Sequence, residues 1–408
     1  MKKCVIVGAS NRCYFMFAKS ITEDYKDNIV ISGIYDPNKT RCNYFQNTIS
    51  KDIKIYEDFD SMLKAEHPDF VIVTTVDCKH HEYIIKSLYF GCDVVCEKPM
   101  TINEENIKLI IKAEKETGKH VAVTFNCRFM PYLAKLKELV QEGTVGNVLN
   151  INYEYLLGRA HGADYFRRWH RYVNNSGSLL VHKSTHHFDI CNWIIGKNPV
   201  KVTALGSLHY FGENHRKQHG TRCLNCTYKN ECDYYLDIIK DSFLDEMYYK
   251  AESEDGYIRD ACPFSSDIDI YDNMSVSVRY EGGALLTYTL TTYNPYEGYK
   301  ISITGDKGRI EALEGYTGEN TMNPIYEIKI FKTNDEVQII KFPKNEGAHG
   351  GGDTRLLQML FKGNMPDPLN QCANSFDGAV SALIGICAVK SIKDNKTIDI
   401  KEIIESIK

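Results

Sequence analysis

The segment KCVIVGASNRC, residues 3–13, decides the fold. It begins as a short apolar strand that ends at Gly8, and helical spacing follows over residues 14–26. The same alternation continues along the first third of the chain. Further apolar strands are predicted over residues 29–36, 70–75, 93–96 and 120–125, and further helices from residue 61 and over residues 80–89 and 104–117. Strands that are apolar throughout, each followed by a helix, predict a parallel sheet covered on both faces, in the doubly wound Rossmann pattern that binds dinucleotides.

The loop after the first strand is a reduced form of the fingerprint G-x-G-x-x-G. It reads GASNRC over residues 8–13, so only the first glycine is present. Gly8 can make the tight turn, and Ser10 is small enough for backbone N–H groups to approach a pyrophosphate. We therefore predict that Gly8, Ser10, Asn11 and Arg12 contact a dinucleotide.

Asp36 ends the second predicted strand. An acid at this distance from the glycine loop accepts hydrogen bonds from the ribose hydroxyls, and its charge repels a 2′-phosphate. Asp36 therefore favours NAD over NADP. The alternative is a turn aspartate before Pro37.

A second informative stretch is CEKP, residues 96–99. It follows a buried strand, and Pro99 biases Lys98 toward an extended conformation. Lys98 would then lie at the carboxyl end of a strand, where open α/β sheets bind ligands. The alternative for the tripeptide alone is a solvated surface lysine.

After Gly146 the pattern changes to strands with one open face. Such strands are predicted over residues 147–157, 275–280, 284–290, 299–304, 309–312, 325–331 and 337–342, with glycine-rich turns between several of them. This pattern predicts a large, mostly antiparallel open sheet in a separate α+β domain. We assign residues 1–125 to an NAD-binding domain and residues 126–408 to an α+β domain that would bind the substrate. Amphipathic helices over 356–361 and 375–389 end the chain.

The stretch from Leu179 to Trp193 is predicted as one helix. Lys183, His186 and His187 fall at i, i+3 and i+4, so the lysine shares a face with both histidines. Such residues are costly on a mostly buried helix unless they line a functional cleft. A neutral histidine can take a proton from an alcohol, and a neighbouring ammonium would keep its pKa low. Structural histidines are the alternative.

Upstream of this helix, residues 166–171 read FRRWHR. The mixture of cations and an aromatic ring suits the binding of sugar hydroxyls or carboxylates. Arg168, Trp169 and His170 are therefore candidate substrate contacts, and a solvated loop is the alternative.

These motifs together resemble the Gfo/Idh/MocA family, named for glucose–fructose oxidoreductase and inositol dehydrogenase. The resemblance rests on Glu97-Lys98-Pro99, on NCRFMP at residues 126–131, on Lys183-x-x-His186 in a helix that reaches Asp189, and on HGGGD at residues 349–353. They occur in the family's order and span nearly the whole chain.

The resemblance implies a Rossmann domain, a C-terminal α+β domain whose open sheet forms homodimers or homotetramers, and C-terminal helices that pack back on the core. It implies that Lys98 lies near nicotinamide and substrate and that His186 is the catalytic histidine. Many members carry an aspartate where this chain has His182, and Lys183 resembles another branch. With this resemblance we extend the cofactor site to Thr75, His80, Glu97, Lys98 and Asn126, and the substrate site to Arg128 and His187.

Four cysteines stand apart from the others: Cys223, Cys226, Cys232 and Cys262. Their spacing suits a tetrahedral thiolate site, and the segment between them has little apolar content of its own. We predict a structural zinc within an insert of about residues 210–265, and a similar insert occurs in one branch of the family. An iron–sulfur cluster, reduced thiols or disulfides are the alternatives.

Composition excludes several classes of protein. The chain has 408 residues, 43% hydrophobic and 25% charged, with a net charge of −5, so no overall basic field favours nucleic acid or membrane surfaces. The N-terminus enters a strand at once and does not resemble a signal peptide. With fourteen cysteines, most of them single within apolar segments, we expect a cytoplasmic protein with reduced thiols.

The sequence therefore predicts an NAD-dependent oxidoreductase that acts on a sugar, polyol or inositol-like secondary alcohol. His186 would take the hydroxyl proton, and Lys98 and Lys183 would orient the oxygen. One alternative is a glycosidase that uses tightly bound NAD in a transient oxidation, elimination and reduction, with Tyr132, Tyr165 or His187 as a further base. Another is a cofactor-binding regulator without turnover.

Overall fold

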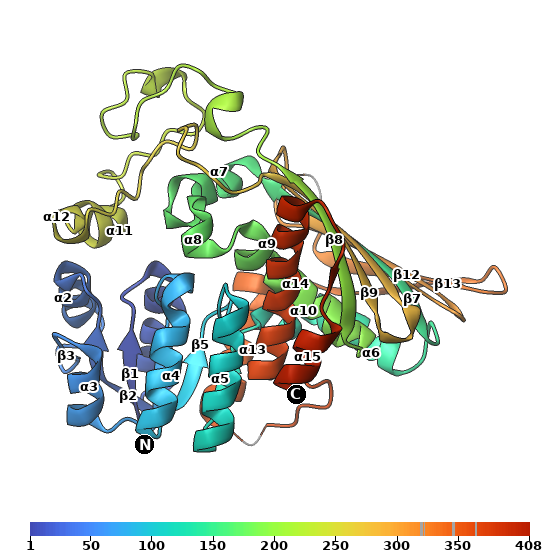
Figure 1. Ribbon diagram of the computed structural model, residues 1–408, viewed down its shortest axis with the longest axis horizontal. Coiled ribbons are helices and arrows are strands. Elements are labelled where there is room, and N and C mark those ends of the chain that lie inside the picture. The colour runs from blue at the N-terminus through green and yellow to red at the C-terminus, as the bar shows by residue number, and fades with distance from the viewer. Residues whose placement is uncertain (319–320, 322, 345–346, 364) are drawn as a thin grey trace.

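The chain folds into two sheets with helices packed between them (Figure 1). The computed structural model describes residues 1–408 except 319–320, 322, 345–346 and 364. The first sheet has seven strands and the second has nine. The predicted fold class, a Rossmann domain followed by an α+β domain with a large sheet, is confirmed.

The first sheet has the strand order β15-β6-β5-β4-β1-β2-β3. Six strands are parallel, and the short β15 pairs antiparallel with β6, so the chain returns from the second domain to cover that edge. The strands are β1 (Lys2–Val7), β2 (Ile29–Tyr35), β3 (Lys54–Ile55), β4 (Phe70–Val73), β5 (Asp93–Cys96), β6 (Val121–Val123) and β15 (Ala373–Asn374).

Helices connect the parallel strands, as the alternation predicts. They are α1 (Lys19–Asp24), α2 (Lys39–Thr48), α3 (Phe59–Glu66), α4 (His80–Phe90) and α5 (Glu104–Thr117). The helix predicted over 14–26 begins with a π-helical segment, Cys13–Ala18. We did not predict α2, because only Cys42 and Phe45 of its residues are buried and its apolar periodicity is weak.

The second sheet has the order β14-β13-β12-β11-β7-β10-β9-β8-β16. Of the described neighbouring pairs, β7 and β10 are parallel and the others antiparallel. The strands are β7 (Val148–Gly158), β8 (Pro199–Ser207), β9 (Asn273–Tyr280), β10 (Leu285–Asn294), β11 (Gly298–Gly305), β12 (Gly308–Gly315), β13 (Ile325–Lys332), β14 (Val337–Pro343) and β16 (Ile398–Asp399). We did not predict β8, although its exposed and buried side chains alternate from Lys201 to Leu205.

The remaining helices follow β6 in the chain. They are α6 (Pro131–Gln141), α7 (Arg159–Arg167), α8 (Val173–Ser176), α9 (Leu179–His182), α10 (Ser184–Ile195), α11 (Ser242–Leu244), α12 (Glu252–Asp255), α13 (Gly352–Lys362), α14 (Ser375–Asp394) and α15 (Lys401–Ile407). Short 3₁₀ and π turns lie at 77–79, 126–129, 169–171, 212–214, 229–231, 245–249, 281–283 and 348–351.

Helix α14 is the central contact between the two sheets. It packs against α10 and β8 on one side and against α5 and β6 on the other. Within the described residues it is the one helix long and apolar enough for a membrane span, and 72% of that stretch is buried inside the protein. Such burial is typical of a core helix.

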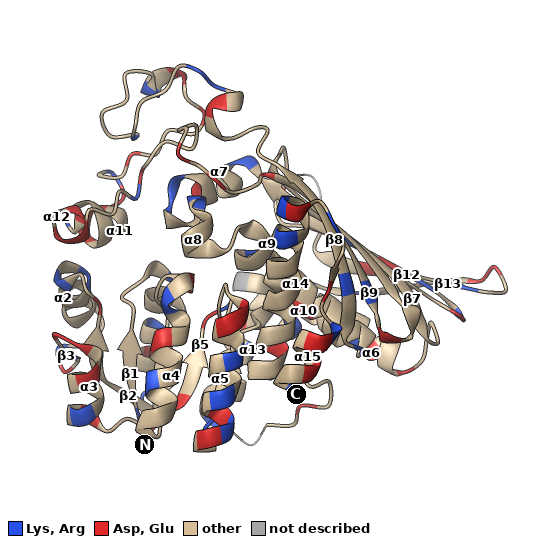
Figure 2. Cartoon of the chain, viewed as in Figure 1, with Lys and Arg blue, Asp and Glu red and all other residues tan. Residues whose placement is uncertain are grey.

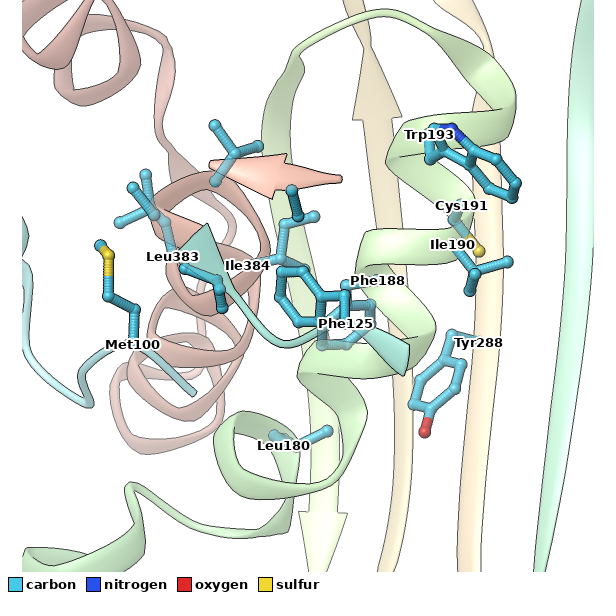
Figure 3. Close-up of a cluster of buried hydrophobic side chains, with 14 of the residues drawn as sticks. Met100, Phe125, Leu180, Phe188, Ile190, Cys191, Trp193, Tyr288, Leu383 and Ile384 are labelled. Atoms are coloured by element: carbon cyan, nitrogen blue, oxygen red, sulfur yellow. The ribbon is translucent and has the colours of Figure 1, made fainter. Parts of the chain in front are cut away.

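One hydrophobic cluster runs from the first sheet through α14 to the second. Figure 3 shows Leu383 and Ile384 of α14 facing Phe125 and Phe188, with Tyr288 of β10 beyond them. This packing fixes α10 against the carboxyl ends of the parallel strands. The side chains of α10 are therefore held in place at the site described next.

Candidate active site

A cavity of about 690 Å³ opens between the two domains. It lies at the carboxyl ends of β1, β4 and β5 and is closed on its other side by α9, α10 and β7. Its walls include these residues predicted for the site: Ser10, Arg12, Asp36, Thr75, His80, Glu97, Lys98, Asn126, Arg168, Trp169, His170, Lys183, His186 and His187. The cofactor and substrate residues predicted from separate motifs thus share one cleft.

The glycine loop turns sharply under this cleft. Gly8 has φ +98°, and a Cβ on it would lie 2.6 Å from the backbone of Thr74, so only glycine fits. The Oγ of Ser10 accepts a hydrogen bond from the N–H of Cys13 at 3.2 Å. Arg12 bridges two acids, Glu97 at 3.0 Å and Asp353 at 3.2 Å. The single retained glycine is therefore at the position that requires one.

Asp36 faces the same loop from the end of β2. Its carboxylate accepts hydrogen bonds from the N–H groups of Ala9 and Asn38, both at 2.8 Å. Arg41 lies 3.2 Å away and holds the pKa of Asp36 down, while burial, the larger effect, raises it. An acid, a tight glycine turn and free space beside them fit the ribose and pyrophosphate of a dinucleotide.

Lys98 reaches across the cleft to the second domain. Its Nζ donates a hydrogen bond to the backbone carbonyl of His182 at 2.8 Å. Burial lowers the pKa of Lys98 to about 8, against the carboxylates of Asp77 and Glu97, which raise it. The lysine is thus buried and titrates near neutrality.

His182 and Asp77 form a pair that the sequence did not predict. Nδ1 of His182 lies 2.5 Å from the carboxylate of Asp77. Burial lowers the pKa of His182 and raises that of Asp77, because it disfavours the charged form of each group. The position that carries an aspartate in many family members is therefore still linked to a carboxylate, but one from the first domain.

His80 braces the loop that carries Lys98. Its ring nitrogens lie 2.8 Å from the carbonyl oxygen of Pro99 and 3.0 Å from that of Thr75. Both ring nitrogens of His80 therefore lie against backbone carbonyl oxygens of the protein. Although His80 lines the cleft, its contacts are those of a positioning residue.

The helix predicted from Leu179 to Trp193 is interrupted at Lys183. Its backbone remains helical there, but α9 ends at His182 and α10 begins at Ser184. The ammonium of Lys183 lies 4.9 Å from the centre of the Tyr155 ring, a cation–π contact. The interruption places this lysine at the cleft beside α10.

His186 and His187 differ in their surroundings. Nδ1 of His186 is buried and has no hydrogen-bond partner among the described residues. His187 stacks on Tyr155 at 4.2 Å, and its Nδ1 lies 2.7 Å from the hydroxyl of Tyr288. Burial lowers the pKa of both histidines, which are therefore neutral near pH 7. Both rings line the cleft, and His187 is the one that a hydrogen bond to the protein holds in place.

The RRWH segment forms an aromatic wall. Trp169 stacks on His170 at 3.7 Å, and His170 lies 4.2 Å from the ring of His182. Arg168 is paired with Asp164 at 3.2 Å, and its Nε is buried without a partner among the described residues. All three predicted contacts line the cleft.

Arg128 and Tyr132 do not line the cavity. The guanidinium of Arg128 donates two hydrogen bonds to Asp189, at 2.7 and 2.6 Å, and its side chain is 3% exposed. Tyr132 is buried and donates to the carbonyl of Glu327 at 2.6 Å. Arg128 therefore forms a structural ion pair with Asp189 of α10 and does not contact the substrate. Tyr132 cannot serve as a base in the cleft.

Asn11, in the glycine loop, lies beside the cleft. Its N–H donates a hydrogen bond to the hydroxyl of Tyr248 at 3.0 Å.

The four cysteines of the insert line one small cavity of about 20 Å³. All fourteen cysteines are free thiols, so the disulfide alternative is not found. Across the residues that the structure describes, no three His, Cys, Asp or Glu side chains are arranged to hold a metal ion. The prediction of zinc is therefore not supported.

Further residues of the cleft carried no signal in the sequence. Glu297, on the loop before β11, lies 3.0 Å from His161 and 3.1 Å from the hydroxyl of Tyr155. Tyr248 and Asp255 reach the cleft from the insert. Each is an isolated residue of a common type, and its role depends on packing between distant segments.

The fold and the cleft define an oxidoreductase with a dinucleotide-binding domain. A family model described as "Oxidoreductase family, NAD-binding Rossmann fold" matches residues 2–125, and one described as "Oxidoreductase family, C-terminal alpha/beta domain" matches residues 137–400. The chain belongs to this family, GFO/IDH/MocA, as the resemblance predicted.

Named relatives agree with this assignment. YteT of Bacillus subtilis (strain 168) is 36% identical over 427 residues, covering 99% of each chain. The scyllo-inositol 2-dehydrogenase (NAD(+)) of the same organism is 27% identical over 206 residues, 50% of this chain and 57% of its own. A solved levoglucosan dehydrogenase in complex with NADH and L-sorbose has a TM-score of 0.70 at 16% identity, covering 99% of this chain and 100% of its own. The last similarity concerns the fold alone.

Proposed function

We propose that the protein is an NAD-dependent dehydrogenase of a sugar, polyol or inositol-like secondary alcohol. The observation that carries the proposal is that Lys98 and His186 line the same cleft as Ser10 and Asp36. The cavity, about 690 Å³, has the size of a small-molecule site. The name of one sequence relative, an inositol dehydrogenase, supports a hydroxylated ring as the substrate.

We assign different parts of the reaction to different residues of the cleft. NAD, when bound, would accept the hydride from the substrate carbon. His186 is neutral and lines the cleft, so its ring can take the hydroxyl proton. Lys98 and Lys183 would hold the oxygen as negative charge develops on it. Trp169 and His170 would bind the ring and its hydroxyl groups, with Arg168 and His187 beside them.

Turnover should depend on the charge of Lys98. Its pKa of about 8 means that the ammonium is present below that pH and is lost above it. Because the proposed role needs the charged form, kcat/KM should fall as the pH rises through about 8. A pH profile of NADH formation measures this. In Lys98→Arg, which stays charged, this fall in kcat/KM with rising pH should disappear. A wild-type rate that instead rises through pH 8 would make Lys98 a neutral base.

Asp36 should select the coenzyme. In Asp36→Ala the ribose hydroxyls lose their carboxylate acceptor, so KM for NAD should rise about tenfold or more. The preference for NAD over NADP should fall with it, because the repulsion of a 2′-phosphate is reduced. Steady-state kinetics with both coenzymes measure the change. Asp60→Ala, which removes an exposed acid of the same domain, is the control, and a wild-type preference for NADP would contradict the assignment.

A glycosidase that retains NAD is the second candidate. The observation that favours it is the surplus of proton-accepting groups around the cleft, including Tyr165, the His161–Glu297 pair and the His182–Asp77 pair. A net dehydrogenation needs one such group, whereas a cycle of oxidation and elimination needs more. Cleavage of an aryl glycoside by purified protein without added coenzyme would support this candidate, and NADH release with a free sugar would exclude it.

We further propose a cytoplasmic homodimer or homotetramer that associates through the second sheet. Leu205, Leu285 and Leu313 are exposed on its strands, at 68%, 43% and 44%. Such apolar side chains on a sheet suit burial against another copy. Light scattering of the purified protein tests the oligomer, and a monomer at micromolar concentration would reject it.

Zinc at the four cysteines is retained only as a proposal from their spacing. It requires about one zinc per chain by elemental analysis, and loss of that zinc in Cys223→Ser. Metal well below one equivalent would agree with the geometry of the thiols and remove zinc from consideration.

A further inference from the structure

Part of the insert packs on the Rossmann domain instead of on its own domain. We call residues 238–257 the clasp. Met247 and Tyr248 of the clasp are buried in the same hydrophobic cluster as Phe45 of α2 and Ile6 of β1. The ring of Phe243 lies 5.3 Å from Tyr14 and 5.7 Å from Tyr44 (centroid distances). The clasp therefore shares a core with the first domain.

Polar contacts attach the clasp to the start of α2. The carboxylate of Glu254 accepts hydrogen bonds from the N–H groups of Lys39 at 2.5 Å and Thr40 at 3.0 Å. Asn38 donates its side-chain amide to the carbonyl of Ala251 at 2.9 Å, and Asp255 pairs with Arg41. Figure 2 shows the acidic α12 lying above the basic end of α2. These contacts begin two residues after Asp36.

The clasp is also bound to the rest of the insert and, through Arg259, to α7 of the second domain. Arg222 pairs with Glu252 at 2.6 Å and with Asp260 at 2.6 Å. Arg259, just beyond the clasp, donates two hydrogen bonds to Asp164, at 2.8 and 3.1 Å. The clasp thus spans the mouth of the cleft and is held on both sides.

The clasp also contributes to the cleft itself. Tyr248, Asp255 and Tyr257 line the same cavity as Asp36 and Ser10. The hydroxyl of Tyr248 accepts a hydrogen bond from the N–H of Asn11, in the glycine loop, at 3.0 Å. A dinucleotide held by Ser10 and Asp36 would therefore be covered by the clasp.

We propose that the clasp is a third wall of the cofactor site, which slows the release of NAD and rejects NADP. This rests on the proposed NAD-dependent function. Release requires space between the clasp and α2, and the contacts of Asn38, Glu254 and Asp255 oppose that separation. Rejection follows because Arg41, which could otherwise bind a 2′-phosphate, is already paired with Asp36 and Asp255. Glu254 adds a further negative charge at the same helix end.

The test compares coenzyme dissociation in the full-length protein and in clasp variants. Protein loaded with NADH is mixed with excess NAD, and the decay of nicotinamide fluorescence gives the dissociation rate. In the double variant Glu254→Gln and Asp255→Asn, the rate should rise at least about tenfold, because charged acceptors are removed from two contacts. The affinity for NADPH relative to NADH should rise as well. Glu405→Gln, an exposed acid on α15, is the matched control.

A second variant guards against a folding defect. Tyr248→Phe keeps the buried ring but removes the hydroxyl that binds Asn11, so it should also speed release while leaving the melting temperature nearly unchanged. Unchanged dissociation rates in both variants would overturn the proposed role of the clasp in coenzyme release. A wild-type protein that binds neither NADH nor NADPH would instead overturn the proposed function, so the two failures are distinguishable.

Discussion

Lys98→Ala should lower kcat by about 10³-fold, and the protein should remain folded. The ammonium of Lys98 lies at the end of β5, donates to the carbonyl of His182 and lines the cleft. Its removal takes away the positive charge that would stabilise the developing alkoxide. Burial of a lysine is unfavourable on its own, as the lowered pKa shows, so the protein should lose little stability without it.

The measurement is steady-state turnover with NAD and the best substrate from a panel of sugars and polyols. Lys108→Ala, on the exposed face of α5, controls for loss of a lysine in the same domain. NADH affinity, measured by fluorescence, should change less than kcat, because the ribose acid and glycine loop are intact. Turnover at the wild-type level would remove Lys98 from the mechanism.

The fold could be predicted from the sequence because buried parallel strands leave a simple pattern. Residues 4–7, 70–73 and 93–96 are apolar nearly throughout, since helices cover both faces of their sheet. The open second sheet leaves the alternating pattern instead, as in β9, where buried and exposed side chains alternate from Asn273 to Tyr280. The helix α2, which carries a weaker pattern, and the strand β8 were missed.

The candidate site could be predicted where a motif fixes both residue type and position. Lys98 follows a strand and His186 sits on a helix that packs at the same sheet edge, so their convergence follows from topology. The pairing of Asp77 with His182 could not be predicted, because the residues are 105 positions apart and meet only through the packing of the folded chain. Arg128 shows the converse: a cation in a site motif was taken for a ligand contact, although Asp189 provides its partner.

The contribution of the insert depends most on tertiary structure. Its sequence is polar and rich in tyrosine, which suggested an insert that is stabilised mainly by its own cysteines. In the structure its residues Met247 and Tyr248 are buried against the first domain. A segment with few apolar residues can therefore be well anchored when a neighbouring domain supplies the rest of the core.

His186→Ala is the second change that we expect to have a large effect, a loss of about 10² to 10⁴ in kcat. The ring of His186 is neutral because burial lowers its pKa, and its Nδ1 has no partner among the described residues. The side chain lines the cleft, where the ring can take the hydroxyl proton as the hydride leaves. Without it the proton must pass to water, and the remaining activity should rise with pH as hydroxide takes its place.

Variants of the neighbouring histidines distinguish two candidate bases, His186 and the His182–Asp77 pair. His187 is fixed by Tyr155 and the Tyr288 hydroxyl, so His187→Phe should reduce kcat far less than His186→Ala. His182 is paired with Asp77, and this buried pair is the competing route for the proton. If His182→Ala abolished turnover while His186→Ala retained it, the pair would be the base and His186 would only shape the cleft. Single-turnover NADH formation in the three variants separates these cases, because product release does not enter that measurement.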